Sequence, residues 1–382
     1  ALFLSGCQDI DLLPKDNLPD ELFWKTPDDF EKECNWLYSR TETFGTKDTD
    51  SDIAYELQEN TTSNGTLIAP NSDGDWSDRF EDLRQCNMIL TKAESYEGDP
   101  SEIARYVAEA HFFRAYTHWR LMKKFNDVPI LTKVLEVDSP ELYGARSSQQ
   151  EVEDFILSEL DAAIPDLPLQ SELADDENGR VTQGAALALK ARVALFAGTW
   201  AKYHQHRSDY QQLLQQAIDA ANQVIDSGEY ALYEGSGDES YRYLFINAGD
   251  DSSEGIFDSR YEDEIRYHSD ACPVYWGWRG TPTKKLADMY LVKSTGLPIE
   301  HANSGFQGYA TIESEYTDRD PRMNQTFLMP GTDYFSPQDG ALTCPPQFTI
   351  RPETRTGYKL WKFMAETMVQ SNQDVYDYHI IR

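Results

Sequence analysis

The 382-residue sequence has few cysteines and little positive charge. Its 34 Lys and Arg stand against 66 Asp and Glu, giving a formal net charge of -32, and no stretch concentrates the basic side chains. Binding along a nucleic-acid backbone depends on clustered positive charge that displaces counterions, so we expect no nucleic-acid ligand. The acidic excess favours solubility and does not specify a fold.

The five cysteines are widely spaced, and none belongs to a CxxC pair. This spacing argues against a zinc cluster. Cys34, Cys86, Cys272 and Cys344 also lack the density of a disulfide framework in a small secreted domain. The sequence leaves open whether one bridge forms among these four residues.

Catalytic signature motifs are missing as well. The sequence contains no GxSxG, HExxH, GxxxxGK[ST] or GxGxxG, so the motifs of common hydrolases, metalloproteases and nucleotide-binding proteins are absent. His204 and His206 could offer two imidazoles to a metal, but no carboxylate pattern accompanies them, and we interpret them as solvated loop residues. His111 and His118 are interpreted as polar packing positions. We expect no cofactor, and 66 acidic residues leave a glycosidase carboxylate pair open.

Residues 71–76 have acidic spacing reminiscent of a calcium loop. Trp76 occupies the sixth position, where such a loop needs Gly, and Asp82 occupies the twelfth, where Glu is usual. The favoured interpretation is a turn that leads into a helix, with Asp75 or Asp78 near the positive end of the helix dipole.

No run of apolar residues reaches the 18 or so that a spanning helix requires. The N-terminus instead has an apolar tetrapeptide that runs into Leu-Ser-Gly-Cys, the form of a bacterial lipobox. We predict that residues 1–6 are a signal-peptide remnant, that Cys7 is the lipidated first mature residue, and that residues 7–25 are its tether. A buried Cys7 after an apolar N-terminus is the alternative.

Residues 26–228 have the periodicity of successive amphipathic helices. Thr26 is a predicted N-cap followed by Pro27 at the first helical position. A second helix is predicted from about Trp76, and a third over residues 102–125 is apolar on more than one side. Such a pattern indicates a helix packed between neighbours.

Three further helices complete the predicted scaffold. The fourth begins near Ser147, with Gln150 placed for a capping box, and stops at Pro165. The fifth starts after the cap Thr182 and is dominated by alanine up to Gly198, and such small side chains let a partner helix approach closely. A polar link of about eight residues leads to the sixth helix. The sixth ends at Gly228 as a C-terminal cap. Helices two and three, and helices five and six, have the dimensions of tetratricopeptide hairpins.

The region after residue 228 has a different composition. Residues 228–382 hold 13 of the 22 Gly and 9 of the 18 Pro, with short alternating stretches. We therefore predict a mainly α fold, in which tetratricopeptide-like helical pairs form a scaffold that carries a loop-rich layer of short strands and helices. Loops held by a rigid frame are frequent binding sites.

Residues 273–280, with the sequence PVYWGWRG, gather large aromatic rings outside any amphipathic period. In a strand, Trp276 and Trp278 would share one face and could stack on sugar rings, with Tyr275 and Arg279 beside them. The rings could equally wedge the loop layer onto the helices. The weaker candidates for the same ligand are Tyr261, Asp263, Tyr267, Asp73, Trp76 and Arg79.

Several segments, taken in order, resemble the SusD/RagB family of outer-membrane nutrient-binding lipoproteins. They are residues 7–14, 23–26, 108–116, 125–129, 181–186, 190–192, 282–286, 318–323 and 357–363. The resemblance implies a lipid-anchored outer-membrane protein at the cell surface that binds oligosaccharides without catalysis. It also implies that the protein acts as a lid for a SusC-like TonB-dependent transporter.

The resemblance assigns regions to the ligand, namely the loop before the second helix and the layer near residue 275. It assigns structural roles to Glu109, Arg114 and residues 319–322. Residues 26–382 would form one SusD-like domain, with the scaffold over 26–228, the ligand-binding layer over 229–376 and a late, truncated helical pair that opens from about 377. A tetratricopeptide-type scaffold that binds peptides or proteins is the alternative function.

Overall fold

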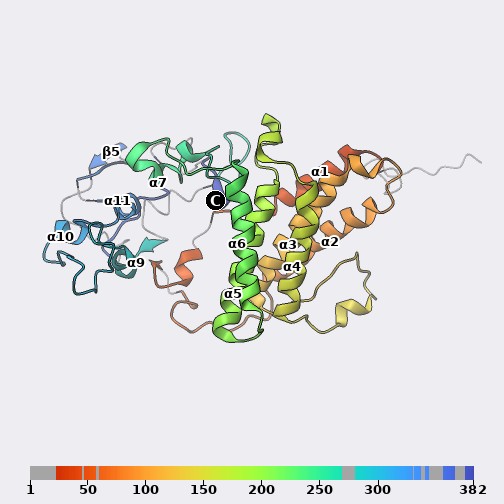
Figure 1. Cartoon of the computed structure of the whole chain (residues 1–382), viewed down its shortest axis with the longest axis horizontal. Coiled ribbons are helices and arrows are strands. Elements are labelled where there is room, and N and C mark those ends of the chain that lie inside the picture. Colours follow the sequence, from red (N-terminus) through yellow and green to blue (C-terminus); the bar gives the residue numbers. More distant parts are fainter. Residues whose placement is uncertain are drawn as a thin grey trace, which may run out of the picture. The chain divides into compact units, whose positions relative to one another are not determined.

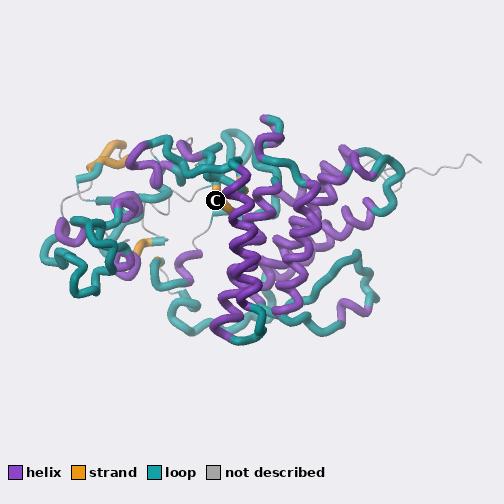
Figure 2. The backbone as a smooth tube through the Cα atoms, viewed as in Figure 1, coloured by secondary structure: helices purple, strands orange, loops and turns teal. Residues whose placement is uncertain are grey.

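The computed structural model describes residues 23–44, 47–56, 60–268, 280–329, 331–336, 340–343, 356–365 and 375–382. Helices supply most of the regular structure, and the strands are short (Figures 1 and 2). The longer helices are α1 (Pro27–Tyr38), α2 (Gly74–Ala93), α3 (Ala104–Phe125), α4 (Gln149–Ala163), α5 (Gln183–His204) and α6 (Tyr210–Ser227). The predicted mainly α fold with packed helical pairs is confirmed.

The shorter elements lie mostly after α6. The helices are α7 (Ser240–Tyr243), α9 (Lys284–Met289), α10 (Ile312–Tyr316) and α11 (Pro321–Thr326). The strands are β1 (Ala54–Tyr55), β2 (Phe257–Ser259), β3 (Thr281–Pro282), β4 (Asp333–Ser336), β5 (Gly340–Thr343) and β6 (Tyr378–Ile381). They form three antiparallel pairs, β1 with β3, β2 with β6 and β4 with β5.

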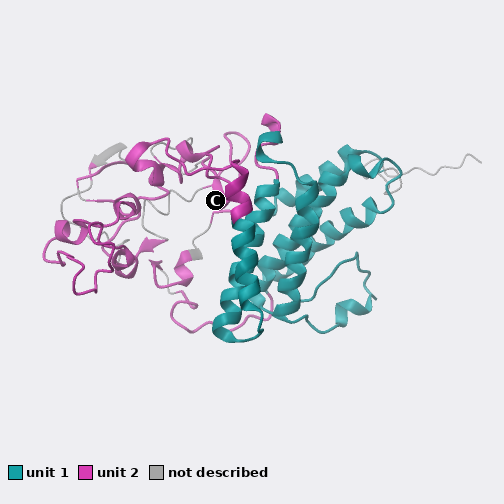
Figure 3. Cartoon of the chain, in the orientation of Figure 1, with its two compact units in different colours: residues 1–40, 73–172, 181–221 teal, residues 41–72, 173–180, 222–382 magenta. Residues whose placement is uncertain are grey.

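The chain divides into two compact units (Figure 3). Unit 1 comprises Ala1–Arg40, Asp73–Glu172 and Val181–Ala221, and unit 2 comprises Thr41–Ser72, Leu173–Arg180 and Asn222–Arg382. We predicted a change of architecture at residue 228, and the last crossing between units falls near it. Residues 41–72 and 173–180, which we had assigned to the helical scaffold, belong to unit 2.

Helix α3 forms the centre of unit 1. It packs against α1, α2, α4 and α5, and side chains on most of its circumference are buried. Phe112 and Trp119 lie on one side of the helix, Ala110 and Leu121 lie on other sides, and all four are buried. The prediction of a helix packed between neighbours is confirmed.

The helix ends follow capping chemistry, with one correction. Thr26 and Asp29 form a capping box at the start of α1, in which the Thr26 backbone N–H donates to the Asp29 carboxylate (2.9 Å). In α4 the capping box joins Ser148 to Glu151, so the prediction of Ser147 and Gln150 was wrong by one residue. Of the two candidate pairs in α4, Ser148 and Glu151 combine a hydroxyl with a carboxylate that accepts from the cap N–H, whereas Gln150 has no carboxylate.

Helix α5 runs to His204, so the link to α6 at Tyr210 is shorter than the predicted eight or so residues. Gly198 lies against α6, where a Cβ atom would come within 2.9 Å of the Leu214 side chain and 3.1 Å of its backbone nitrogen. The glycine therefore permits the close helix-helix approach that the small side chains predicted. The helix ends with Gln205 in the left-handed conformation (φ 58°), and Gly228 follows α6 with φ 70° as predicted.

Residues 377–382 were predicted to open a late helix, and the structure corrects this. Tyr378–Ile381 forms β6, which pairs antiparallel with β2. Ile380 and Ile381 are buried, and His379 is held from both sides by Asp258 and the Leu244 carbonyl, each at 2.8 Å. These contacts with distant residues select an extended backbone in a segment whose local sequence permits a helix.

No helix among the described residues combines the length and the apolar character that a membrane crossing needs. Cys86 has a free, buried thiol, and the buried Cys34 thiol donates to the Tyr106 carbonyl. Cys7, Cys272 and Cys344 lie outside the described residues.

Candidate functional site

A tight hairpin in unit 2 carries three of the predicted ligand residues. Glu262 and Arg266 exchange backbone hydrogen bonds (3.1 and 2.9 Å), and Glu264 between them has a left-handed backbone (φ 64°). The hairpin follows β2 directly and places the exposed Asp263 at its turn. Paired backbone groups thus hold the carboxylate in a position open to solvent.

Asp263 and Tyr267 are linked across this hairpin. The Tyr267 hydroxyl donates to the Asp263 carboxylate (2.6 Å) and accepts from the Glu264 backbone N–H. The pKa of Tyr267 is raised because its hydroxyl donates to a carboxylate. An aromatic ring beside an acceptor carboxylate has the two components that a sugar ring uses, an apolar face and hydroxyl groups.

Tyr261 is a buried residue that packs against the hairpin. It is 8% exposed, and the Arg266 guanidinium lies 4.5 Å from its ring centroid. Its backbone N–H donates to the Asp377 carboxylate (2.8 Å). The structure therefore brings Asp263 and Tyr267 together at the surface and places Tyr261 in the packing beneath them.

The packing beneath the hairpin is an aromatic cluster around Phe44. The rings of His268 (4.3 Å between centroids), Tyr378 (5.0 Å) and Tyr376 (5.1 Å) surround Phe44. Burial lowers the pKa of His268 to about 4, so its imidazole is neutral at physiological pH. We did not predict Phe44 or His268 as part of this region.

Tyr275, Trp276, Trp278 and Arg279 lie outside the described residues, which end at His268 and resume at Gly280. Their assignment to the ligand therefore stays a prediction. On either side of this segment, His268 contacts Phe44 and Tyr376, and β3 pairs with β1.

Asp73 and Trp76 meet at the start of α2 in unit 1. Asp73 is the N-cap and accepts from the Asp75 backbone N–H (2.9 Å) and from Lys124 (3.0 Å). The half-buried Trp76 packs against Phe125 (5.1 Å), and the Arg146 guanidinium lies 4.7 Å from the indole centroid. The favoured interpretation of residues 71–76 as a turn before a helix is confirmed.

Arg79 is occupied inside unit 1. It is buried, donates to the Arg40 carbonyl (3.1 Å) and pairs with Asp82 (2.7 Å). Asp82 also accepts from the Arg40 side chain (2.7 Å). Asp82, the twelfth position of the calcium pattern, therefore holds two arginines, and the Arg79 guanidinium does not contribute to the exposed surface.

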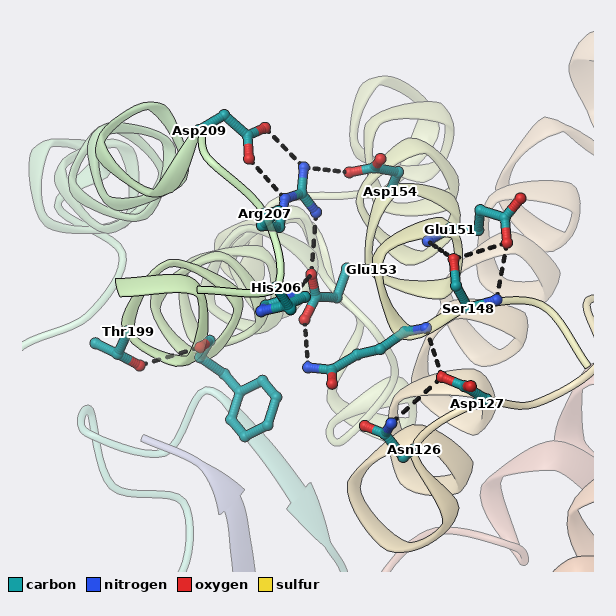
Figure 4. Close-up of polar contacts among 12 residues, drawn as sticks. Asn126, Asp127, Ser148, Glu151, Glu153, Asp154, Thr199, His206, Arg207 and Asp209 are labelled. Carbon is teal, nitrogen blue, oxygen red and sulfur yellow. Dashed lines mark hydrogen bonds and ion pairs between the residues drawn. The ribbon is translucent and has the colours of Figure 1, made fainter. Parts of the chain in front are cut away.

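A polar network ties the α5–α6 link to α4 (Figure 4). The fully buried Glu153 accepts from Arg207 (3.0 Å) and Gln149 (2.8 Å), and His206 lies 3.4 Å from the same carboxylate. Arg207 also donates to Asp154 and Asp209. His206 is therefore a packing residue of this network, which corrects our interpretation of it as a solvated loop residue.

His204 does not join His206. Its ring lies 4.1 Å from the Trp200 ring on α5, whereas His206 faces α4. Among the described residues no group of three or more His, Cys, Asp or Glu side chains is arranged to hold a metal ion. The two imidazoles therefore contact different helices, His204 its own α5 and His206 α4.

Arg114 and His118 confirm the polar packing of α3. Arg114 donates twice to Glu159 of α4 (2.6 and 2.8 Å) and once to Asn87 of α2 (2.9 Å). Burial alone would raise the pKa of Glu159, but hydrogen bonds with His111 and Arg114 lower it. His118 is fully buried against Phe155, and burial lowers its pKa to about 4.

Comparison with known sequences identifies two family matches. Residues 28–195 match a SusD-like family described as "Starch-binding associating with outer membrane", and residues 243–382 match the SusD family. The matches cover both the helical scaffold and the loop-rich region. The chain belongs to the SusD/RagB family.

Relatives of this SusD-like chain are distant in sequence and similar in fold. SusD-like proteins P38 and P2 of Formosa agariphila are each 24% identical, over 68% and 78% of this chain, which spans 51% and 59% of their lengths. A SusD-like protein of Bacteroides fragilis is 25% identical with a TM-score of 0.75, covering 97% of this chain and 75% of that one. A SusD-like carbohydrate binding protein from the same species has 21% identity and a TM-score of 0.74, covering 94% and 72%.

The SusD family comprises binding proteins rather than enzymes. The Arg319 contacts agree with the structural role that the resemblance assigned to residues 319–322. Its guanidinium donates to the carbonyls of Ala287 (2.7 Å), Tyr290 (2.8 Å) and Glu315 (2.9 Å), and Asp320 caps α11. The family motif therefore links α9 and α10 of unit 2.

Proposed function

We propose that this SusD-like chain binds oligosaccharides at the outer surface of a bacterial outer membrane. The observation that carries the proposal is the match of both halves of the chain to SusD-type families, one of them described as starch-binding. A solved relative of the same fold is named a carbohydrate binding protein. The net charge of -32 favours neutral glycans over polyanionic ones, because a strongly acidic surface repels anions.

We place the principal contacts on unit 2. Asp263 and Tyr267 offer a carboxylate and a ring at the surface, held in register by their hydrogen bond. Trp276 and Trp278 would stack on sugar rings, with Tyr275 and Arg279 beside them. Asp73 and Trp76 of unit 1 stay secondary candidates, because a salt bridge with Lys124 and a guanidinium over the indole already occupy them.

We further propose a lipid anchor at Cys7 and a SusC-like TonB-dependent transporter as partner. An exposed apolar stripe on α5 supports the idea of a protein partner. Trp200 is 38% and Tyr203 73% exposed, and Leu195 lies on the same helix with half of its surface open to solvent. Exposed apolar side chains grouped on one helix are typical of protein-binding faces.

Isothermal titration calorimetry against two neutral probes tests the proposal. Maltoheptaose represents the starch of the family description, and laminarin represents the ligand in the name of another solved relative, a laminarin binding SusD-like protein. We expect saturable binding of at least one probe. Absence of binding to both probes, and to a wider neutral glycan array, would contradict the proposal.

The α5 stripe also supports a second function, that of a peptide- or protein-binding scaffold without affinity for sugars. Under that function Trp276→Ala and Trp278→Ala would lower the stability of unit 2 and leave ligand binding unchanged. Under the proposed function the same variants lose glycan affinity while the protein stays folded. Calorimetry and thermal unfolding of the same samples separate the two functions.

A further inference from the structure

Lys362 is a half-buried lysine of unit 2 whose amine lies among aromatic rings. Its Nζ atom lies 3.6 Å from the centroid of the Phe245 ring and 4.8 Å from that of the Tyr241 ring. The amine donates a hydrogen bond to the Tyr241 hydroxyl (3.1 Å). In the part of the chain that the structure describes, no carboxylate forms an ion pair with it. Rings and a hydroxyl therefore provide its contacts there.

A second positive side chain approaches the same ring. The guanidinium carbon of Arg382 lies 4.9 Å from the Phe245 centroid, and Glu254 accepts a hydrogen bond from this arginine (2.8 Å). The Glu254 carboxylate therefore pairs with the arginine and not with the lysine. Because arginine stays protonated in proteins, Lys362 is the one of the two cations that can relieve their repulsion by losing a proton.

These surroundings favour the neutral form of the Lys362 amine. Burial makes the largest contribution and, together with the Arg382 charge, lowers its pKa to about 7. The exposed Asp48 acts in the opposite direction, since its carboxylate attracts the ammonium. The ring faces also attract the ammonium, but Phe245 has to serve two cations at once. A large fraction of the amine is therefore neutral at physiological pH.

Lys284 shows the contrast with a lysine held by a carboxylate. Its amine donates to both oxygens of Asp288 (2.8 and 2.6 Å) and to the Tyr309 hydroxyl (2.6 Å). Burial alone would lower its pKa, but these hydrogen bonds raise it. A protonated amine cannot attack a carbonyl carbon, whereas a lysine that is desolvated or placed beside another cation is activated as a nucleophile. Lys362 meets both conditions.

We propose that Lys362 is a covalent modification site for small aldehydes, the open-chain form of a reducing sugar among them. The Nζ lone pair attacks the aldehyde carbon, and the carbonyl oxygen leaves as water with both amine protons. A C=N bond replaces the C=O bond, so the step needs no oxidant, reductant or cofactor. The Tyr241 hydroxyl lies within hydrogen-bond distance of the reacting nitrogen. The reaction does not depend on glycan binding, so its test is independent of the proposed function.

The experiment treats the folded chain with glyceraldehyde and sodium cyanoborohydride, which reduces the imine to a stable secondary amine. Peptide mass spectrometry then compares the labelling rates of Lys362 and of the exposed Lys285 in the same sample. An ordinary lysine is almost wholly protonated at pH 7, so we expect Lys362 to be labelled about tenfold faster there. The ratio of the two rates should fall as the pH rises to about 10, where ordinary lysines also lose protons. Equal rates at pH 7, a ratio that does not change with pH, or no label on Lys362 would overturn the proposal.

Two variants test whether the neighbouring cation activates the amine. Arg382→Gln removes this charge and should raise the pKa of Lys362, so the labelling ratio at pH 7 should fall about threefold. At about pH 10 the ratio should match that of the unmodified chain, because the amine is neutral in both. Arg146→Gln is the matched control, since Arg146 also lies over an aromatic ring, 4.7 Å from the Trp76 centroid in unit 1. No fall in Arg382→Gln, or the same fall at both pH values or in both variants, would overturn the proposal.

Discussion

Arg114 and Glu159 form a two-point ion pair inside unit 1, with the guanidinium of α3 donating to both carboxylate oxygens of α4 at 2.6 and 2.8 Å. Asn87 of α2 accepts a third hydrogen bond from the same guanidinium (2.9 Å). One side chain of the central helix therefore joins three helices, and Glu159 and Asn87 are both buried.

Replacing Arg114 should strongly destabilise unit 1. Arg114→Ala leaves the Glu159 carboxylate buried without its main donor, and breaking a buried pair in this way costs about 3–5 kcal/mol. Urea denaturation measures the loss. Lys133→Ala is the control, because it breaks the exposed pair with Glu141 and should cost less than about 1 kcal/mol. A similar small loss for both variants would contradict the central role of Arg114.

The contact of Gly198 with Leu214 predicts an intolerance for larger side chains. Gly198→Ala places a methyl group 2.9 Å from Leu214 and should cost roughly 1–3 kcal/mol, despite the better helix propensity of alanine. Gly74→Ala at the start of α2 meets no atom within 4 Å and should be neutral or slightly stabilising. Thermal unfolding of both variants checks this. A stabilised Gly198→Ala would show that the helices can separate without cost.

Acidification should strengthen the region where β6 begins. Burial raises the pKa of Asp250 to about 7 and that of Asp377 to about 6. The Asp250 carboxyl accepts from the Asp377 backbone N–H (2.7 Å). A carboxyl whose pKa is raised in the folded state stabilises that state at low pH, and this contribution is lost as the pH rises through the folded pKa.

Asp250→Asn tests this pH dependence. The amide keeps an acceptor oxygen for the Asp377 N–H but cannot ionise, so the variant should gain stability relative to the unmodified chain as the pH rises from about 5 to about 8. Urea unfolding across this range measures the difference, with Asp238→Asn at an exposed position as the baseline. A difference that does not grow with pH would mean that Asp250 is ionised without cost.

The exposed pair on the hairpin should matter for ligand affinity. Asp263→Ala removes the acceptor carboxylate and should weaken binding of the responsive glycan probe about tenfold, because hydrogen bonds to a charged group contribute more than neutral ones. Tyr267→Phe keeps the ring and removes the link to Asp263, so a smaller loss is expected. Glu262→Gln on the same hairpin is the control, and an equal loss there would indicate a nonspecific charge effect.

The exposed stripe of α5 predicts a partner contact that can be broken without affecting sugar binding. Tyr203→Glu should reduce copurification of the SusC-like transporter from cells that produce both proteins. Tyr143→Glu is the control, since Tyr143 is 78% and Tyr203 73% exposed but Tyr143 lies outside the stripe. Retention of the transporter by Tyr203→Glu would place the partner contact elsewhere.

The scaffold could be predicted from sequence where the signal is local. The caps at Thr26, Thr182 and Gly228 depend on residues within a few positions of each other, and they mark the helix ends that the structure has. The small residues of α5 predicted the close approach of another helix, but not which side chain would meet them. Leu214 lies against Gly198, and it becomes a neighbour only after folding.

The site could be predicted only in part for the same reason. Asp263 and Tyr267 are four residues apart, so their pairing is a local event. Phe44 meets His268 across more than two hundred residues, and its surrounding sequence has no apolar period that would indicate burial. The strand at Tyr378–Ile381 likewise depends on β2, which lies far away in the chain.

The chain passes between its two units at residues 40–41, 72–73, 172–173, 180–181 and 221–222. A single proteolytic cut or a simple truncation therefore cannot release either unit whole. During synthesis from the N-terminus, residues 41–72 are made long before the partners that they pair with in β3 and around His268. Residues 41–72 therefore cannot form these contacts until most of the polypeptide has been synthesised.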